Sequence, residues 1–143
     1  MRLSKYSDYA LRVLMYAALR KPELATIEEV ADAFDISKHH LVKVVHALGR
    51  NGFLSTRRGI GGGFTLALPP AEIGLGNVVR LTESDESVID CMDSPGQPCR
   101  IFPACRLKTV LGEAGAAFFE VLDRYSLEDL VKRKAEMKNL LEV

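Results

Sequence analysis

Apolar residues recur every three or four positions through the first fifty residues, and this spacing predicts three amphipathic helices. Thr26 and Glu29 have the spacing of a capping box, in which the hydroxyl accepts from the N–H three residues on and the carboxylate reaches back. Ser37 is expected to cap the third helix. Two short helices joined by a tight turn are typical of a helix-turn-helix, whose second helix lies in the major groove of DNA. The three predicted helices cover residues 4–20, 27–34 and 37–49.

The period changes after residue 52, where apolar and polar residues begin to alternate as they do in strands. Two such stretches flank a glycine-rich run at residues 59–63, so the pattern predicts a β-hairpin whose tip carries Arg57 and Arg58. Glycine allows backbone N–H groups to approach a phosphate closely, and Gly61 and Gly62 are the candidates for that contact. We interpret this basic hairpin as the wing of a winged helix.

The second half of the chain predicts a short helix over residues 77–81 and a long one from about Pro103 to Arg124. The long helix has a broad apolar face and many small residues, which would allow another helix to approach closely. We interpret it as a dimerisation helix; the alternative is a helix that packs on its own domain. Ser126 and Asp129 are expected to cap a last segment that is charged and frayed.

The predicted fold is therefore mainly α with a small β wing, and it combines a winged helix-turn-helix domain with a long dimerisation helix. A chain of 143 residues can bury a core of its own. No stretch approaches the roughly 20 apolar residues that cross a bilayer, and no apolar signal sequence follows Met1. We expect a cytoplasmic protein with no membrane partner. Its predicted parts are the DNA-binding domain (1–70), the connecting helix and cysteine loop (71–106), the dimerisation helix (104–125) and the C-terminal segment (126–143).

The net charge is zero, but the charges are unevenly distributed: residues 1–68 have a net charge of +4 and residues 69–143 one of −4. No acidic residue occurs from Ile36 to Ala71, so the predicted recognition helix and wing can attract phosphate. A solvated basic face without a partner is the alternative. His46 is expected to be a partly buried neighbour of the interface. The residues expected to contact double-stranded promoter DNA are Ser37, Lys38, His39, His40, Lys43, Arg57, Arg58, Gly61 and Gly62.

The three cysteines of the chain, Cys91, Cys99 and Cys105, all lie in one stretch that is interrupted by proline and glycine. An odd number argues against a closed set of disulfides, and gaps of seven and five residues differ from the close pairs of structural zinc sites. Wider spacing on a loop suits an iron–sulfur cluster, whose irons bind thiolates. Structural or unligated cysteines, and a zinc site, are the alternatives.

Four segments of the chain, taken together, resemble the winged-helix iron–sulfur repressors, a family that includes the NsrR and IscR regulators. The resemblance extends from residue 1 to about residue 131, and residues 122–130 are most similar to the NsrR branch. The segments that carry the resemblance are Tyr6–Arg12, His40–Val45, Arg58–Leu66 and Pro103–Lys108.

The resemblance implies a homodimer in which the three cysteines hold an iron–sulfur cluster, with four irons preferred to two. IscR-like members use a histidine shortly after the third cysteine as the fourth ligand, but residues 106–108 are arginine, leucine and lysine here. NsrR-like members can use an aspartate in the first helix of the other subunit, and that residue corresponds to Asp8. Arg12 would form an ion pair with Asp8 along the helix, and it could also orient Asp8 as a ligand.

The function that the resemblance implies is repression. The homodimer would bind palindromic promoter DNA and be released when nitric oxide reacts with the cluster. A carboxylate is a harder donor than a thiolate, so the iron that it binds would be open to a small ligand. A regulator of the same fold that senses iron or cluster supply is one alternative, and an iron–sulfur electron carrier is another. The local sequence suggests no nucleophile–base pair, so enzyme activity is not expected.

Overall fold

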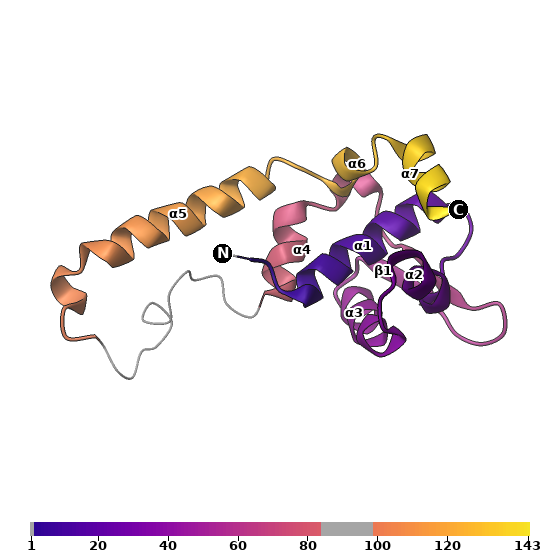
Figure 1. The fold of residues 1–143 in the computed structure, drawn as a ribbon, viewed down its shortest axis with the longest axis horizontal. Coiled ribbons are helices and arrows are strands. Elements are labelled where there is room, and N and C mark those ends of the chain that lie inside the picture. The colour runs from indigo at the N-terminus through magenta and orange to yellow at the C-terminus, as the bar shows by residue number, and fades with distance from the viewer. Residues whose placement is uncertain (1, 84–98) are drawn as a thin grey trace.

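Helix α1 is the central element of a helical head from which one long helix projects (Figure 1). It packs on the recognition helix, on the wing and on the helix that precedes the cysteines, and eight of its sixteen residues are buried. The protein is described here by a computed structural model of residues 2–83 and 99–143. Its helices and strands are α1 (Lys5–Arg20), α2 (Ile27–Phe34), α3 (Lys38–Arg50), β1 (Leu54–Arg57), β2 (Gly63–Leu66), α4 (Leu75–Thr82), α5 (Arg106–Leu122), α6 (Leu127–Leu130) and α7 (Lys134–Leu141), with two short 3₁₀ helices, η1 (Pro70–Glu72) and η3 (Phe102–Ala104). We call α1 to α4, the two strands, α6 and α7 the head.

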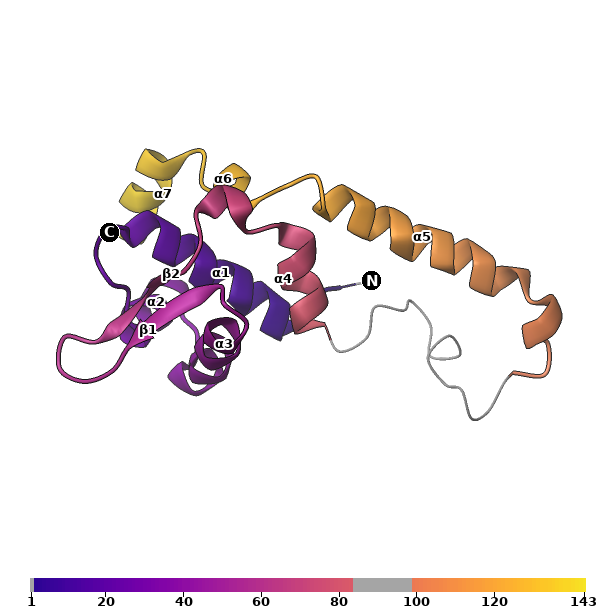
Figure 2. The same ribbon diagram turned by 180° about the vertical axis from the view of Figure 1, so that it is seen from behind.

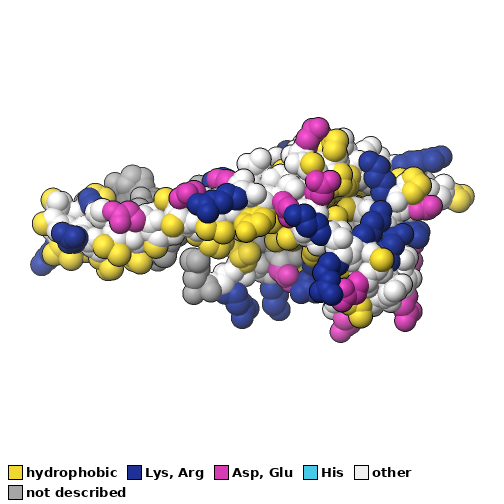
Figure 3. Space-filling view, turned by 90° about the horizontal axis from the view of Figure 1, so that it is seen from above, with side chains coloured by type: hydrophobic (Ala, Val, Ile, Leu, Met, Phe, Trp, Pro, Cys, Tyr) yellow, Lys and Arg dark blue, Asp and Glu magenta, His cyan; other side chains and the backbone are white. Residues whose placement is uncertain are grey.

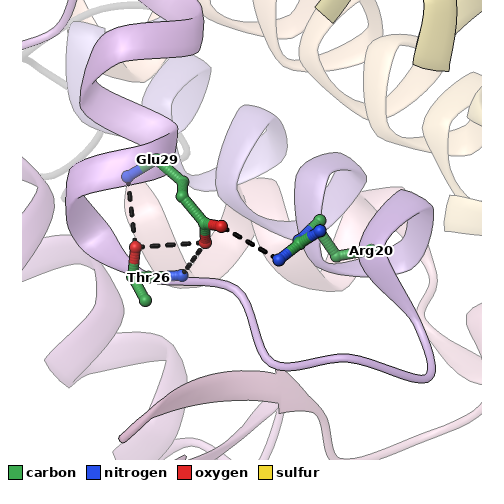
Figure 4. Close-up of polar contacts among 3 residues, drawn as sticks. All are labelled: Arg20, Thr26 and Glu29. Carbon is green, nitrogen blue, oxygen red and sulfur yellow. Dashed lines mark hydrogen bonds and ion pairs between the residues drawn. The ribbon is translucent and has the colours of Figure 1, made fainter. Parts of the chain in front are cut away.

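Helices α2 and α3 form the helix-turn-helix that the sequence predicts. The Thr26 hydroxyl accepts from the Glu29 N–H at 3.2 Å and the Glu29 carboxylate accepts from the Thr26 N–H at 2.7 Å, so the capping box is confirmed (Figure 4). Arg20, in the last turn of α1, donates to the same carboxylate at 2.9 Å, which ties α1 to the start of α2. Ser37 occupies the N-cap position of α3, but its side chain makes no capping hydrogen bond, so the prediction that its hydroxyl caps α3 is wrong.

The wing is a two-stranded antiparallel hairpin in which Arg57 lies opposite Gly63. Its base is fixed to the head, because Phe64 is 2% exposed and exchanges two backbone hydrogen bonds with Ala25, of 2.9 and 2.8 Å. A Cβ at Gly63 would lie 2.5 Å from the Ala25 carbonyl oxygen, so this close approach requires glycine. Beyond that anchor the loop of the hairpin extends away from the helices (Figure 2).

Helix α5 is an arm that leads away from the head in both ribbon views (Figures 1 and 2). None of its 17 residues is buried, and its C-terminal end, at Phe119, lies against α4. Apolar side chains gather along one side of the arm (Figure 3), and Leu107, Val110 and Val121 are each about half exposed or more. Within the described residues, no helix combines the length and the apolar character that crossing a membrane requires.

The residues after α5 return to the head. The Asp129 carboxylate accepts from the Ser126 N–H at 2.8 Å, so the predicted capping box is present and begins α6. Leu127 is fully buried, and the end of the chain places Leu141 and Val143 against the core. The prediction of a frayed C-terminal segment is therefore wrong, because a few apolar residues within a charged stretch hold α7 on α1.

We expect Thr26→Ala to lower the free energy of unfolding by about 1 kcal/mol, because the Glu29 N–H would lose its acceptor and the capping box would be broken. Ser37→Ala is the matched control. It occupies the N-cap of the next helix without a side-chain capping bond, so its effect should be much smaller. Urea unfolding followed by circular dichroism would measure both, and equal losses would contradict the assignment of the cap.

Candidate DNA interface and metal centre

The solvent-facing side of α3 carries the side chains that are predicted to read DNA. The four aliphatic residues on its other side are buried, which fixes the rotation of the helix. His46 is exposed as well, so the prediction that it is partly buried is wrong. The predicted contact residues that are exposed here are Ser37, Lys38, His39, His40 and Lys43.

Lys38 is already engaged by an acidic residue of the neighbouring helix. Its ammonium group forms an ion pair with Glu28 in α2, and the two side chains are 55% and 70% exposed. The hydrogen bond from Lys38 lowers the pKa of Glu28, and the same bond raises the pKa of Lys38. If Lys38 binds DNA as predicted, a phosphate would have to compete with Glu28 for this cation.

Two tyrosines of α1 pack against α3, the predicted recognition helix. The Tyr6 hydroxyl donates to the Lys43 carbonyl oxygen at 3.4 Å, and the rings of Tyr9 and His40 lie 6.2 Å apart between centroids. With Lys5 these four residues line a surface pocket of about 210 Å³. A displacement of the N-terminal half of α1 would therefore act directly on the side of α3 that is predicted to read DNA.

The tip of the wing is a tight turn closed by a hydrogen bond of 2.9 Å from the Gly62 N–H to the Gly59 carbonyl oxygen. Gly61 has a φ of +70°, which β-carbon-bearing residues rarely adopt. A Cβ at Gly62 would overlap the Arg57 carbonyl oxygen and would lie 2.7 Å from that of Gly59. Arg57 and Arg58 are exposed beside this turn, and Ile60 at its apex is fully exposed.

The start of α1 is joined to the end of α4 by a buried polar network that has no local sequence signal. The Thr82 and Ser7 hydroxyls lie 2.8 Å apart, and both residues are buried. The Glu83 carboxylate accepts from the Ser4 N–H at 2.8 Å and from the Ser7 hydroxyl. Burial acts to raise the pKa of Glu83, but these hydrogen bonds outweigh it and the pKa is lowered. Glu83 is therefore a fixed, ionised link between the two helices.

Two of the three predicted thiolate ligands lie at the two ends of residues 99–105, two successive turns that precede α5 and include η3. We call this segment the cysteine turn. The Phe102 N–H donates to the Cys99 carbonyl oxygen at 2.8 Å, and the Cys105 N–H donates to that of Phe102 at 3.4 Å. Cys99 is exposed and Cys105 is partly exposed, and both thiols are free. Cys105 is also the N-cap of α5, where the helix dipole favours negative charge. Cys91 lies outside the described residues.

Asp8, the predicted fourth ligand, is on the surface of α1. Its two carboxylate oxygens accept from the Arg12 Nε at 3.0 and 3.1 Å, so the predicted ion pair is present. The Asp8 side chain is 46% exposed, and the Arg12 guanidinium also lies over the Phe34 ring at 5.4 Å. This arrangement holds the carboxylate in one orientation while it stays accessible.

Asp8 and the cysteine turn are not brought together within one chain. The turn lies at the end of the α5 arm that is far from the head, whereas Asp8 belongs to the head (Figures 1 and 2). At about 1.5 Å per residue, the 17 residues of α5 span roughly 26 Å. In residues 2–83 and 99–143 of a single chain, no group of three or more histidine, cysteine and acidic side chains could hold a metal ion.

Comparison with known proteins agrees with this architecture. Residues 3–133 match the family model Rrf2, described as an iron-dependent transcriptional regulator. The chain is 46% identical to the HTH-type transcriptional regulator NsrR of Bacillus subtilis, over 100% of this chain and 99% of that protein. It is 46% identical to NsrR of Geobacillus kaustophilus, over 99% of this chain and 97% of that protein. These relatives are named as regulators, which agrees with the expectation that the chain is not an enzyme.

Solved structures share the fold. CymR, the global cysteine regulator of B. subtilis, superposes with a TM-score of 0.74 at 25% identity and covers 93% of this chain and 98% of its own. IscR of T. potens superposes with a TM-score of 0.73 over 93% and 88% of the two chains, and at 21% identity it shows the fold alone. The chain is a winged-helix transcriptional regulator, and it belongs to the Rrf2 family.

Proposed function

We propose that this chain is an iron–sulfur-dependent repressor that binds palindromic promoter DNA as a homodimer and releases it in response to nitric oxide. The observation that carries the proposal is the position of α5. The arm holds the cysteine turn far from the head of its own chain and leaves an apolar face exposed. A second copy of the chain would cover that face and would present its own Asp8 to the turn.

The composition of the arm supports a dimer. Leu107, Val110 and Val121 are 59%, 52% and 49% exposed, and burying the exposed half of such a side chain contributes about 1 kcal/mol. Gly112 and Gly115, with the alanines beside them, leave room for a second helix at close range. Two copies of α3 related by a two-fold axis would then read the two halves of a palindrome.

The donor set fits an iron–sulfur cluster. Cys99 and Cys105 are free thiols next to solvent on a tight turn, and soft thiolates suit iron in such clusters. Cys91 would be the third ligand and Asp8 of the other subunit the fourth, with Arg12 orienting it. A bound cluster, of four irons in preference to two, would supply the iron that reacts with nitric oxide.

The residues of α1 explain how such a ligand could influence DNA binding. Asp8 is one residue from Tyr9 and two from Tyr6, and these tyrosines contact His40 and Lys43 on α3. While Asp8 is held by the partner, the N-terminal half of α1 is fixed, and α3 is fixed with it. When Asp8 is released, only its ion pair with Arg12 remains, and α3 loses that restraint.

DNA contact is assigned to two surfaces. On α3, Lys38 and Lys43 would bind phosphates, and His39 or His40 would donate to a base. On the wing, Arg57 and Arg58 would bind a phosphate or enter the minor groove. The N–H groups of Gly61 and Gly62 would approach the sugar–phosphate backbone of the DNA.

A second candidate function is a regulator of the same fold that senses iron or cluster supply. The description of the matched family as iron-dependent favours it. The two functions differ in the signal, and they share the DNA-binding head and the ligand set. Titration of the anaerobic protein on its promoter with nitric oxide, and separately with an iron chelator, distinguishes them.

We expect Cys99→Ala to abolish both the cluster and specific operator binding, because a thiolate ligand is lost. Arg100→Ala, at the exposed neighbouring position, is the control and should retain both. Iron and sulfide analysis of anaerobically purified protein, with a gel-shift titration of the operator, gives the readout. Tight operator binding by the cluster-free variant would reject the proposal.

Asp8→Ala should still assemble a cluster through the cysteines but should react with nitric oxide at a different rate. Asp32→Ala, which removes an exposed acidic side chain from α2, should leave the rate unchanged. Stopped-flow absorbance measures both variants against the natural protein. If nitric oxide reacts with the Asp8 variant at the natural rate, Asp8 is not the fourth ligand.

Gly62→Ala is expected to open the wing turn, because its Cβ would overlap the Arg57 carbonyl oxygen. We expect operator affinity to fall about tenfold, equivalent to ~1.4 kcal/mol, with little change in thermal stability. Gly49→Ala is the control, since its Cβ would meet only ordinary contacts, the nearest at 3.5 Å. Unchanged affinity of the Gly62 variant would show that the wing does not contact DNA.

A further inference from the structure

A planar ion pair joins the arm to the head at the point where the arm ends. The Arg80 Nη1 and Nη2 atoms donate to the two carboxylate oxygens of Asp123 at 2.7 and 2.8 Å, and the guanidinium stacks on the Phe119 ring at 4.4 Å. Arg80 belongs to α4, whereas Phe119 lies in α5 and Asp123 is its C-cap. We call these three residues the arm clamp.

The backbone of α4 lies directly against the clamp. A Cβ at Gly76 would overlap the Asp123 carboxylate, so any larger residue there would displace the ion pair. Just after α5, the Leu75 N–H donates to the Tyr125 carbonyl oxygen at 3.0 Å. The end of the arm is therefore fixed to the first turns of α4 by both backbone and side-chain contacts.

The clamp is well suited to fixing the angle between the arm and the head. An exposed ion pair contributes little to stability, and the two side chains are 31% and 46% exposed. A bidentate, stacked guanidinium nevertheless fixes direction, because its two parallel hydrogen bonds and its ring contact define one plane. The hydrogen bond from Arg80 also lowers the pKa of Asp123, which shows that the pair favours the ionised carboxylate.

A small change in this angle has a large effect at the far end of the arm. Over the roughly 26 Å of α5, a tilt of about 10° at the clamp displaces the other end by about 4–5 Å. In a dimer joined through the arms, the same tilt would change the separation of the two heads. Recognition helices on neighbouring half-sites must lie about 34–36 Å apart, so such a displacement is significant.

We propose that Arg80 and Asp123 are positioning residues that set the separation of the two recognition helices, and hence the half-site spacing that the regulator accepts. The inference rests on the proposed homodimer. The partner is double-stranded DNA with two inverted half-sites, and the clamp determines the spacing between the half-sites rather than the bases that are read within each.

The test measures affinity for a series of operators whose half-sites are moved apart or together by one or two base pairs. The natural protein should prefer one spacing by about tenfold or more, equivalent to ~1.4 kcal/mol. Asp123→Asn and Arg80→Lys, which each remove the bidentate pair, should reduce that preference to about threefold or less, equivalent to ~0.7 kcal/mol. Both variants should remain dimers by sedimentation and should keep their thermal midpoint.

Glu120→Gln is the matched control. It removes the exposed Arg124–Glu120 ion pair near the same end of α5 and leaves the clamp intact, so the natural spacing preference should remain. If the clamp variants keep the natural spacing preference, this inference is overturned but the proposed function is not. The same holds if both clamp variants unfold, because the ion pair would then act on stability and not on spacing. A natural protein that is monomeric, or that accepts every spacing equally, would overturn the proposed function as well.

Discussion

The apolar side of α5 must be buried, and the described part of its own chain does not bury it. Every other amphipathic helix of the head has an internal partner: α1 is enclosed by α3, α4 and the wing, and even α7 rests on α1. The apolar side of the arm has no such partner within the described residues, and under the proposed function a second molecule would cover it. If that molecule is another copy of this chain, both the cysteine turn and the spacing of the two DNA-reading heads become properties of one interface.

Helix α1 connects these functions. Its buried face forms the core, its first turn is bound to α4 through Ser7 and Glu83, and its tyrosines contact α3. Asp8 lies on the remaining, exposed side of the same helix. Because the helix is packed along its whole length, a force applied at Asp8 would be transmitted to α3 rather than absorbed locally.

The sequence predicts those features whose causes are local. Apolar periodicity located the first three helices, and the Thr26–Glu29 and Ser126–Asp129 spacings marked two helix starts correctly. Glycines beside arginines indicated the wing. Ser37 failed as a cap because residue preference identifies the N-cap position but not the direction of its hydroxyl. The end of the chain was misjudged because its charged composition masked the apolar contacts of Leu141 and Val143.

Contacts between distant residues could not be predicted in the same way. Arg80 and Asp123 are 43 residues apart, and no local pattern pairs them. Likewise, Glu83 has no sequence signal for its partners Ser4 and Ser7, which are more than seventy positions away. The candidate site has the same character, since the exposed Asp8 and the free thiols become one ligand set only if a second chain brings them together.

The charge distribution explains why the geometry of a dimer would matter so much to this regulator. Residues 1–68 have a net charge of only +4, and Glu28 would compete with a DNA phosphate for Lys38. Affinity for a single half-site should therefore be modest and sensitive to salt. When two heads are joined at the correct separation, the second binding event becomes intramolecular and the affinity rises steeply; at the wrong separation that gain is lost. In the proposed dimer the recognition helices would not have to be blocked to release DNA, because a displacement of a few ångströms between them would spoil their fit to the two half-sites.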